Sequence, residues 1–248
     1  PPDATVPTNL EFCDADADGF GVFTLTDADE EITGTLSNLL ISYHETFSDA
    51  ENNLFPIVGE YNNIVVYEQL IYVRVEDTTI STDCFTYLEL ILVVNDVPQI
   101  ETNPTPLEVC DNDTDGFALF DLSLANQEIL NGLDPDDFLV TYYQTPENAE
   151  LETNPITTPL AYTNVAPFTQ QVYVRVENGT TECYNTTALT LIVNELPVLI
   201  QPDPLELCDD NNTGDEVEEF TLEDSISQVL NGQTGIDITF HQTQEDAD

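Results

Sequence analysis

The chain has 248 residues, of which 49 are Asp or Glu and only two are Lys or Arg, so its formal charge is −47. This balance excludes nucleic acid as a partner and argues against an anionic membrane surface, because both need a basic patch. Hydrophobic residues make up 41% of the chain, enough for a packed core. No apolar run reaches the roughly 18 residues of a membrane-spanning helix, so no direct membrane insertion is expected.

The sequence repeats itself about every 98 residues. The segment L-E-F-C-D at residues 10–14 returns as L-E-V-C-D at 107–111 and as L-E-L-C-D at 205–209, and Y-V-R-V-E occurs at 72–76 and 173–177. Self-similarity of this kind predicts tandem domains. We expect a window cut from a longer array, with repeat 1 at residues 1–97, repeat 2 at 98–196 and the N-terminal part of repeat 3 at 197–248.

An acidic loop follows the first cysteine of each repeat, and in the first two it reads D-x-D-x-D-G-F. Alternate carboxylates in a tight loop converge, Gly permits the sharp turn, and calcium prefers such hard oxygen ligands. Residue 12 of the loop is Leu and not Glu, so it is not an EF-hand. The alternative is a hydrated Asx turn that only caps a strand. The predicted Ca²⁺ ligands are Asp14, Asp16, Asp18 and Phe20 (by its carbonyl), then Asp111, Asp113, Asp115 and Phe117, and, in a degenerate third loop, Asp209, Asn211 and Asp215.

Hydrophobic alternation predicts short strands and one short helix in each repeat. About 98 residues of this kind indicate an all-β fold of tandem Ig-like (Greek-key) β-sandwiches, and Pro-containing linkers suggest an extended rod. The predicted strands are 20–25, 39–45, 71–76 and about 90–94 in repeat 1, and 117–122, 138–144, 172–177 and about 189–193 in repeat 2. The predicted helices are 27–32, 124–130 and 223–230, the last two followed by Asn-Gly.

Five cysteines fit the repeat, one before the acidic loop and one after the Y-V-R-V-E strand. Two cysteines per repeat in an apparently secreted chain favour disulfides over free buried thiols. We expect the pairs Cys13–Cys84 and Cys110–Cys183, with a partner for Cys208 beyond the sequence.

No catalytic motif is present, so no enzymatic activity is expected. His44 and His241 share one repeat position, which is Tyr143 in repeat 2, and this exchange favours a structural role. Arg74 and Arg175 also share a position, where an ion pair with a nearby carboxylate is expected.

The motifs L-E-x-C-D-x-D-x-D-G-F, Y-V-R-V-E and V-N-[DE]-x-P resemble the tandem repeats of very large cell-surface proteins of Bacteroidota, which are exported by the type IX secretion system. That group includes adhesins of gliding motility and surface attachment. The resemblance implies an extracellular, cell-surface location and O-glycosylation at Asp-Ser/Thr tripeptides, here at Thr78 and Ser225.

Two functions remain open. The first is a structural stalk or filament segment of a surface adhesin, stiffened by calcium and one disulfide per repeat, with neighbouring repeats as partners, lateral self-assembly and an unidentified adhesion target. The second is a module that binds a polysaccharide or a protein, which should show an aromatic cluster that differs between repeats around one pocket. The aromatics at shared positions favour the stalk, namely Phe20 and Phe117, and Phe23, Phe120 and Phe220.

Overall fold

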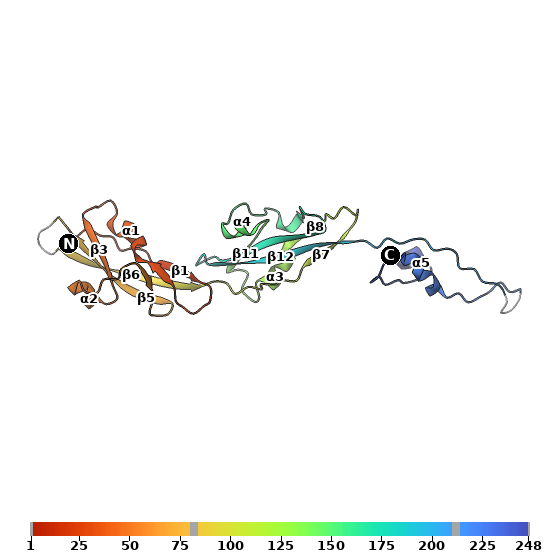
Figure 1. Cartoon of the computed structure of the whole chain (residues 1–248), viewed down its shortest axis with the longest axis horizontal. Coiled ribbons are helices and arrows are strands. Elements are labelled where there is room, and N and C mark those ends of the chain that lie inside the picture. The colour runs from red at the N-terminus through yellow and green to blue at the C-terminus, as the bar shows by residue number, and fades with distance from the viewer. Residues whose placement is uncertain (1, 80–83, 210–213, 248) are drawn as a thin grey trace. The chain divides into compact units, whose positions relative to one another are not determined.

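A computed structural model describes residues 2–79, 84–209 and 214–247 (Figure 1). It confirms the predicted fold class, because the first two repeats are each an Ig-like arrangement of a four-stranded sheet facing a two-stranded sheet. Among the described residues, no helix is long and apolar enough to cross a bilayer.

Repeat 1 builds its larger sheet from four strands in the order β1-β6-β5-β3. These are β1 (Leu10–Asp14), β3 (Leu39–His44), β5 (Glu68–Asp77) and β6 (Phe85–Asp96). β1 runs parallel to β6, with Cys13 opposite Asn95, whereas the other neighbours are antiparallel. The smaller sheet pairs β2 (Val22–Thr24) with β4 (Glu60–Asn62).

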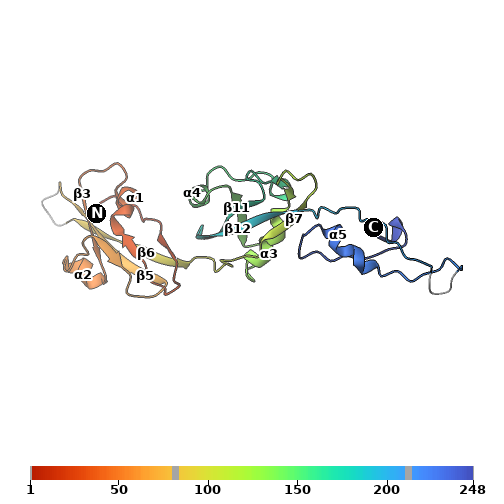
Figure 2. The same cartoon turned by 45° about the vertical axis from the view of Figure 1, so that its right-hand side comes forward.

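Repeat 2 has the same strand order, β7-β12-β11-β9. Figure 2 labels three of these strands, β7, β12 and β11. The strands are β7 (Leu107–Asp111), β9 (Phe138–Tyr143), β11 (Thr169–Asn178) and β12 (Tyr184–Glu195). The short strands β8 (Leu119–Phe120) and β10 (Tyr162–Thr163) form its second sheet.

The core follows the alternation in the sequence. Ile71, Val73 and Val75 on β5 are fully buried, and they pack with Leu90 and Leu92 on β6. The matching positions of repeat 2 are equally buried, namely Val172, Val174, Val176, Leu189 and Leu191. Two of the recurring aromatics lie in the core and two do not. Phe23 and Phe120 are buried, whereas Phe20 and Phe117 are about 40% exposed. The strands predicted to begin at these two residues begin later, at Val22 and Leu119.

The predicted helices are present as a 3-10 turn that continues into a short α-helix. The pairs are η1 (Leu25–Ala28) with α1 (Asp29–Thr33), η2 (Leu122–Ala125) with α3 (Asn126–Ile129), and η4 (Leu222–Ser225) with α5 (Ile226–Leu230). After α3 and α5 the Asn-Gly dipeptides take positive φ, +49° at Asn131 and +47° at Asn231, which is the predicted left-handed stop.

A second helix in each repeat was not predicted. α2 (Phe47–Asn52) and α4 (Pro146–Glu150) follow β3 and β9, and the hydroxyls of Thr46 and Thr145 cap their first turns. α2 packs against β3 and β5 on the face opposite the core. Two further short helices are η3 (Pro159–Ala161) and α6 (Gln244–Ala247).

Repeat 3 contains no strand among its described residues. Phe220 is 45% exposed, whereas its counterpart Phe23 is 3% exposed. No strand is present among residues 204–209 and 214–247 to cover the apolar positions of repeat 3.

Candidate functional site

The acidic loop of repeat 1 is folded by its first carboxylate. One oxygen of Asp14 accepts the backbone N–H groups of Asp16 and Ala17 at 3.1 and 3.2 Å, and the other accepts that of Gly19 at 2.8 Å. The Asp14 side chain is 2% exposed. This is the Asx turn weighed as an alternative, so Asp14 anchors the loop whether or not a metal binds.

Repeat 2 reproduces the loop. Asp111 is fully buried and accepts the N–H groups of Asp113, Thr114 and Gly116 at 3.1, 2.7 and 2.8 Å. Gly116 has a φ of +80°, and a Cβ there would lie 2.8 Å from Pro167. Only glycine combines this φ with this close approach.

The first two carboxylates of each loop have pKa values shifted in opposite directions, down at Asp14 and Asp111 and up at Asp16 and Asp113. Burial raises the pKa of Asp14, but hydrogen bonds from Gly19, Asp16 and Ala17 outweigh it and hold that pKa below its usual value. The hydrogen bond to Asp14 and the charge of Asp18 raise the pKa of Asp16. The charge of Asp115 likewise raises the pKa of Asp113. The neighbouring carboxylate charges therefore repel one another, and a cation held between them would offset that repulsion.

Each of these loops gathers three carboxylates, Asp14, Asp16 and Asp18 in one and Asp111, Asp113 and Asp115 in the other. One oxygen from each lies within 4.8 Å of the others. An all-oxygen set with two exposed members is chemically suited to a hydrated hard cation such as calcium.

The third loop differs. Asp209 accepts the N–H of Gly214 at 2.7 Å, and Asp215 accepts that of Val217 at 3.0 Å. Asn211 lies outside the described residues. No three-carboxylate group is found among the described residues of this loop.

A buried asparagine, which was not predicted from the sequence, holds each of the first two acidic loops; in repeat 1 it directly follows β4, the strand paired with β2. The amide nitrogen of Asn63 donates to the carbonyls of Gly19 and Val65 at 3.0 and 2.7 Å, and its oxygen accepts the N–H of Gly21 at 2.6 Å. Asn164 makes the matching three bonds in repeat 2. The signal was available, because the two asparagines are separated by the same 101 residues as the two arginines.

The two arginines hold α2 and α4 on their sheets. Arg74 pairs with Glu76 at 2.6 Å, donates to the carbonyls of Ala50 and Glu51 at the end of α2, and lies 3.8 Å from the ring centre of Phe85. Arg175 repeats this with Glu177, Ala149, Glu150 and Tyr184. The expected ion pair is present in both, and its role is structural.

His44 is fully buried beneath α2. Its Nδ1 lies 2.8 Å from the carbonyl of Leu54 and its Nε2 lies 2.9 Å from the Ser42 hydroxyl. A carbonyl only accepts, so Nδ1 carries the proton. These satisfied contacts agree with the structural role expected for His44.

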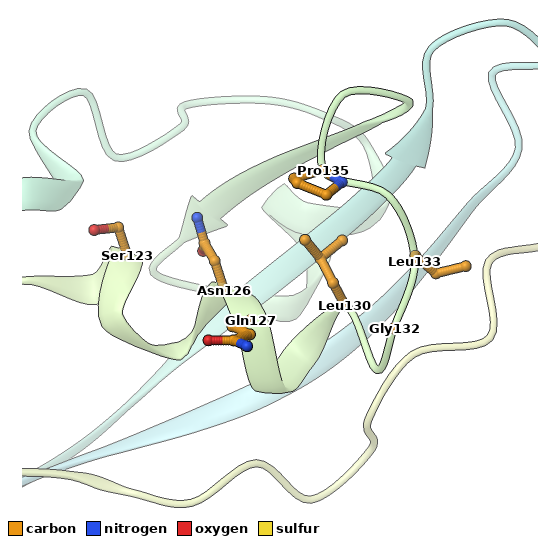
Figure 3. A pocket seen from close by; sticks show the side chains of 7 residues that line it. All are labelled: Ser123, Asn126, Gln127, Leu130, Gly132, Leu133 and Pro135. Atoms are coloured by element: carbon orange, nitrogen blue, oxygen red, sulfur yellow. The ribbon is translucent and has the colours of Figure 1, made fainter.

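A pocket of about 580 Å³ lies beside α3 in repeat 2 (Figure 3). Ser123, Asn126, Gln127 and Leu130 from η2 and α3 line it, together with the loop to Pro135. None of its seven lining residues carries a carboxylate, imidazole, thiol or amine, so the pocket holds no acid–base pair of the kind that catalysis uses.

The predicted disulfide pairing is wrong. The bond joins Cys13 of repeat 1 to Cys183 of repeat 2, with a Cα–Cα distance of 5.5 Å and 170 residues between them in sequence. Both cysteines belong to one compact unit of the chain, made of residues 1–107, 120–162 and 171–191. The link is therefore between repeats and not within one.

The parallel register of β1 and β6 gives the physical reason. Cys13 lies opposite Asn95 at the end of β6, whereas Cys84 precedes the start of that strand. The 11 residues between Asn95 and Cys84 span roughly 36 Å of strand, far beyond the 7 Å that a disulfide bridges. The predicted pair Cys110–Cys183 fails for the same reason, since β7 and β12 repeat the arrangement.

Two polar contacts lie beside the inter-repeat bond. The Cys183 sulfur lies 3.9 Å from the carbonyl of Asn95, and the Asn185 amide donates to the carbonyl of Pro98 at 3.1 Å. Pro98 ends the V-N-D-V-P segment, so the segment that joins the repeats contacts β12, which begins directly after Cys183.

The two predicted O-glycosylation residues differ in solvent exposure. Thr78 is exposed, with its hydroxyl donating to the carbonyl of Asn38. Ser225 is 7% exposed and donates to the carbonyl of Leu222 within η4, and this burial argues against its modification in the described conformation.

These features define a class of protein: tandem Ig-like sandwiches in which one repeat is covalently tied to the next. The chain belongs to the Flavobacterium inter-domain disulphide bond domain family, which matches residues 9–98, 106–197 and 204–248. No curated protein sequence matches the chain.

Solved structures resemble the chain only distantly. A titin fragment of domains I67–I69 (E-to-A variant) is 12% identical, covers 83% of this chain and 69% of its own, and has a TM-score of 0.28. Extracellular domains 3–5 of Drosophila OTK are 11% identical, cover 76% and 60%, and have a TM-score of 0.31. Human mucin-like protocadherin EC1-2 is 14% identical, covers 65% and 86%, and has a TM-score of 0.22. Such likenesses support no functional argument.

Proposed function

We propose that the chain is a structural stalk segment of a large secreted cell-surface protein of the adhesin type, in which disulfides carry tension from repeat to repeat. The observation that supports this most is the Cys13–Cys183 bond. A disulfide between repeats suits an oxidising, extracellular setting. In the chain-entropy model, closing a loop of this length stabilises the folded state by roughly 5 kcal/mol.

The bond changes the route that a pulling force takes. Tension that enters at the N-terminus reaches Cys13 on β1, crosses to Cys183 and leaves through β12. Residues 14–182 lie outside this route, and they include β2 to β6 of repeat 1 and β7 to β11 of repeat 2. Most of both cores is thus shielded from extension.

Disulfides of the same kind can join each repeat of a longer array to another. Cys110 holds in repeat 2 the position of Cys13 and is exposed, and Cys208 holds it in repeat 3 and is also exposed. We expect each of them to bond the second cysteine of a following repeat. An array linked in this way transmits force without unfolding its repeats.

Single-molecule extension of the chain, held at its termini, tests this function. Reduction should release up to about 600 Å of extra contour length, because 170 residues become extensible at 3.3–3.6 Å each. The oxidised chain should not yield this length. Equal contour lengths in both states would contradict the proposal.

Calcium binding to the first two acidic loops is part of the proposal. The converging carboxylates of each loop and their mutual repulsion support it. A ligand that binds only the folded state stabilises it by mass action, so millimolar Ca²⁺ should raise the melting temperature and EDTA should reverse the rise.

Variants of the loops provide the control. Asp16→Asn with Asp18→Asn, and the same changes at Asp113 and Asp115, should abolish the calcium-dependent rise. Asp134→Asn with Asp136→Asn removes two exposed carboxylates elsewhere and should preserve it. A melting temperature that is the same in calcium and in EDTA would refute this part.

The proposals on location, export and biological role are supported by the family match and by the disulfide between repeats. We propose cell-surface attachment after type IX export, a role in surface attachment or gliding motility, lateral self-assembly, O-glycosylation at Thr78, and no enzymatic activity. Loss of surface exposure of the protein in cells lacking type IX secretion would support the export route, and unchanged exposure would contradict it.

A further inference from the structure

Repeat 1 carries an aromatic cluster on the outer face of its large sheet. Phe47 at the start of α2 packs edge-on against Tyr72 of β5 and Tyr87 of β6, with ring centres 5.7 and 5.1 Å apart. A pocket of about 380 Å³ is lined by these three rings with Val6, Leu88 and Glu89. Phe47 is 46% exposed, although large aromatics are usually covered.

Repeat 2 lacks this cluster. Pro146 stands in place of Phe47, Thr186 in place of Tyr87 and Ala188 in place of Glu89. Thr186 instead donates its hydroxyl to Glu150 at 3.2 Å. An aromatic cluster that differs between repeats around one pocket is the sign set out above for a ligand-binding module.

The strands beneath the pocket exclude recognition of an extended peptide by strand pairing. β5 lies between β6 and β3, and β6 lies between β1 and β5, so neither offers a free edge. A pocket of about 380 Å³ falls at the small-ligand end of the usual range.

The charges around the pocket restrict the class of ligand that it can bind. Glu89 and the formal charge of −47 disfavour an anion. The Arg74 guanidinium, paired with Glu76, already lies over Phe85, with a nitrogen 3.5 Å from the Tyr87 hydroxyl, so a cation already contacts this group of rings. A neutral ligand remains, with apolar faces to stack on rings and hydroxyls to bond Glu89 and the tyrosines.

We propose that the Phe47–Tyr72–Tyr87 pocket binds sugar rings of a neutral glycan. A pyranose ring has apolar C–H faces and a rim of hydroxyls, which match the rings and the single carboxylate. This function is independent of the stalk, because none of these side chains belongs to the Cys13–Cys183 link.

Affinity electrophoresis of the whole chain through gels that contain a neutral glycan tests the proposal. The probes are laminarin, galactomannan and xyloglucan, with anionic alginate as the comparison. At least one neutral glycan should retard the chain and alginate should not. Absence of retardation by all three neutral probes, or equal retardation by alginate, would overturn the proposal.

Variants locate the site. Phe47→Ala and Tyr87→Thr, the latter installing the residue of repeat 2, should each weaken glycan binding at least tenfold with unchanged circular dichroism. Tyr173→Ala alters the counterpart of Tyr72 in repeat 2 and should leave binding within twofold. Unchanged binding in both pocket variants would overturn the assignment, as would tenfold loss in Tyr173→Ala.

Discussion

At the scale of single residues, buried polar side chains specify the conformation of the loops. Asp14 and Asn63 are 2% and 3% exposed, and each makes three hydrogen bonds to loop backbone. Because buried backbone groups need partners, these side chains replace the sheet ladder where the chain turns. The acidic loop is thus ordered by neutral and charged hydrogen bonds before any cation is considered.

Asn63→Ala should destabilise the chain by about 2–3 kcal/mol, because it leaves the backbone groups of Gly19, Gly21 and Val65 unsatisfied. Urea unfolding measures the loss. Asn62→Ala, at the exposed neighbouring position on β4, should stay within about 0.5 kcal/mol. Equal losses in the two variants would show that the hydrogen bonds of Asn63 do not stabilise the loop.

At the scale of elements, a tyrosine hydroxyl contacts the first helical segment of repeat 1 and of repeat 2. The Tyr43 hydroxyl on β3 donates to Asp29 of α1 at 2.6 Å, and the Tyr142 hydroxyl on β9 donates to the carbonyl of Leu122 at 2.8 Å. Burial, with the hydrogen bond to Asp29, raises the pKa of Tyr43 above its usual range, and burial also raises the pKa of Tyr142.

These raised pKa values have a defined consequence for stability. Below about pH 10 both tyrosines are protonated in the folded and unfolded chain. Above it the unfolded chain loses protons first, so the free energy of unfolding should fall as the pH rises. Urea unfolding between pH 8 and pH 11 should show this fall, and Tyr43→Phe should reduce it. Tyr67→Phe, at a half-exposed position, serves as the control and should show the same fall as the unaltered chain. If Tyr43→Phe also showed the same fall as the unaltered chain, burial of the Tyr43 hydroxyl would not be the cause.

Most elements could be predicted from the sequence, because alternation on β5 and β6 and the Asn-Gly stops are local signals. α2 and α4 could not, since six and five residues are too short for periodicity and are held by Arg74 and Arg175 from distant strands. Phe20 and Phe117 were misplaced because a recurring aromatic indicates a shared environment and not a buried one.

At the scale of the whole molecule, the cysteines show where sequence reasoning failed. Two cysteines per repeat are equally compatible with pairing inside a repeat and pairing between neighbours. The choice depends on the parallel β1–β6 register, which places Cys13 and Cys84 at opposite ends of one sheet. The carboxylates of the first two loops lie together as groups, because their spacing within one loop is a local signal. Calcium binding in all three loops stays a prediction.

The central claim is that the disulfide joins neighbouring repeats, and tryptic mapping of the oxidised chain tests it most directly. Arg74 and Arg175 are the only Lys or Arg residues, so trypsin gives three peptides, 1–74, 75–175 and 176–248. After thiols are blocked and the chain is unfolded, our account predicts a disulfide-linked product of 1–74 with 176–248, lost in Cys183→Ser and kept in Cys208→Ser. A product in which 1–74 is instead linked to 75–175 would contradict it.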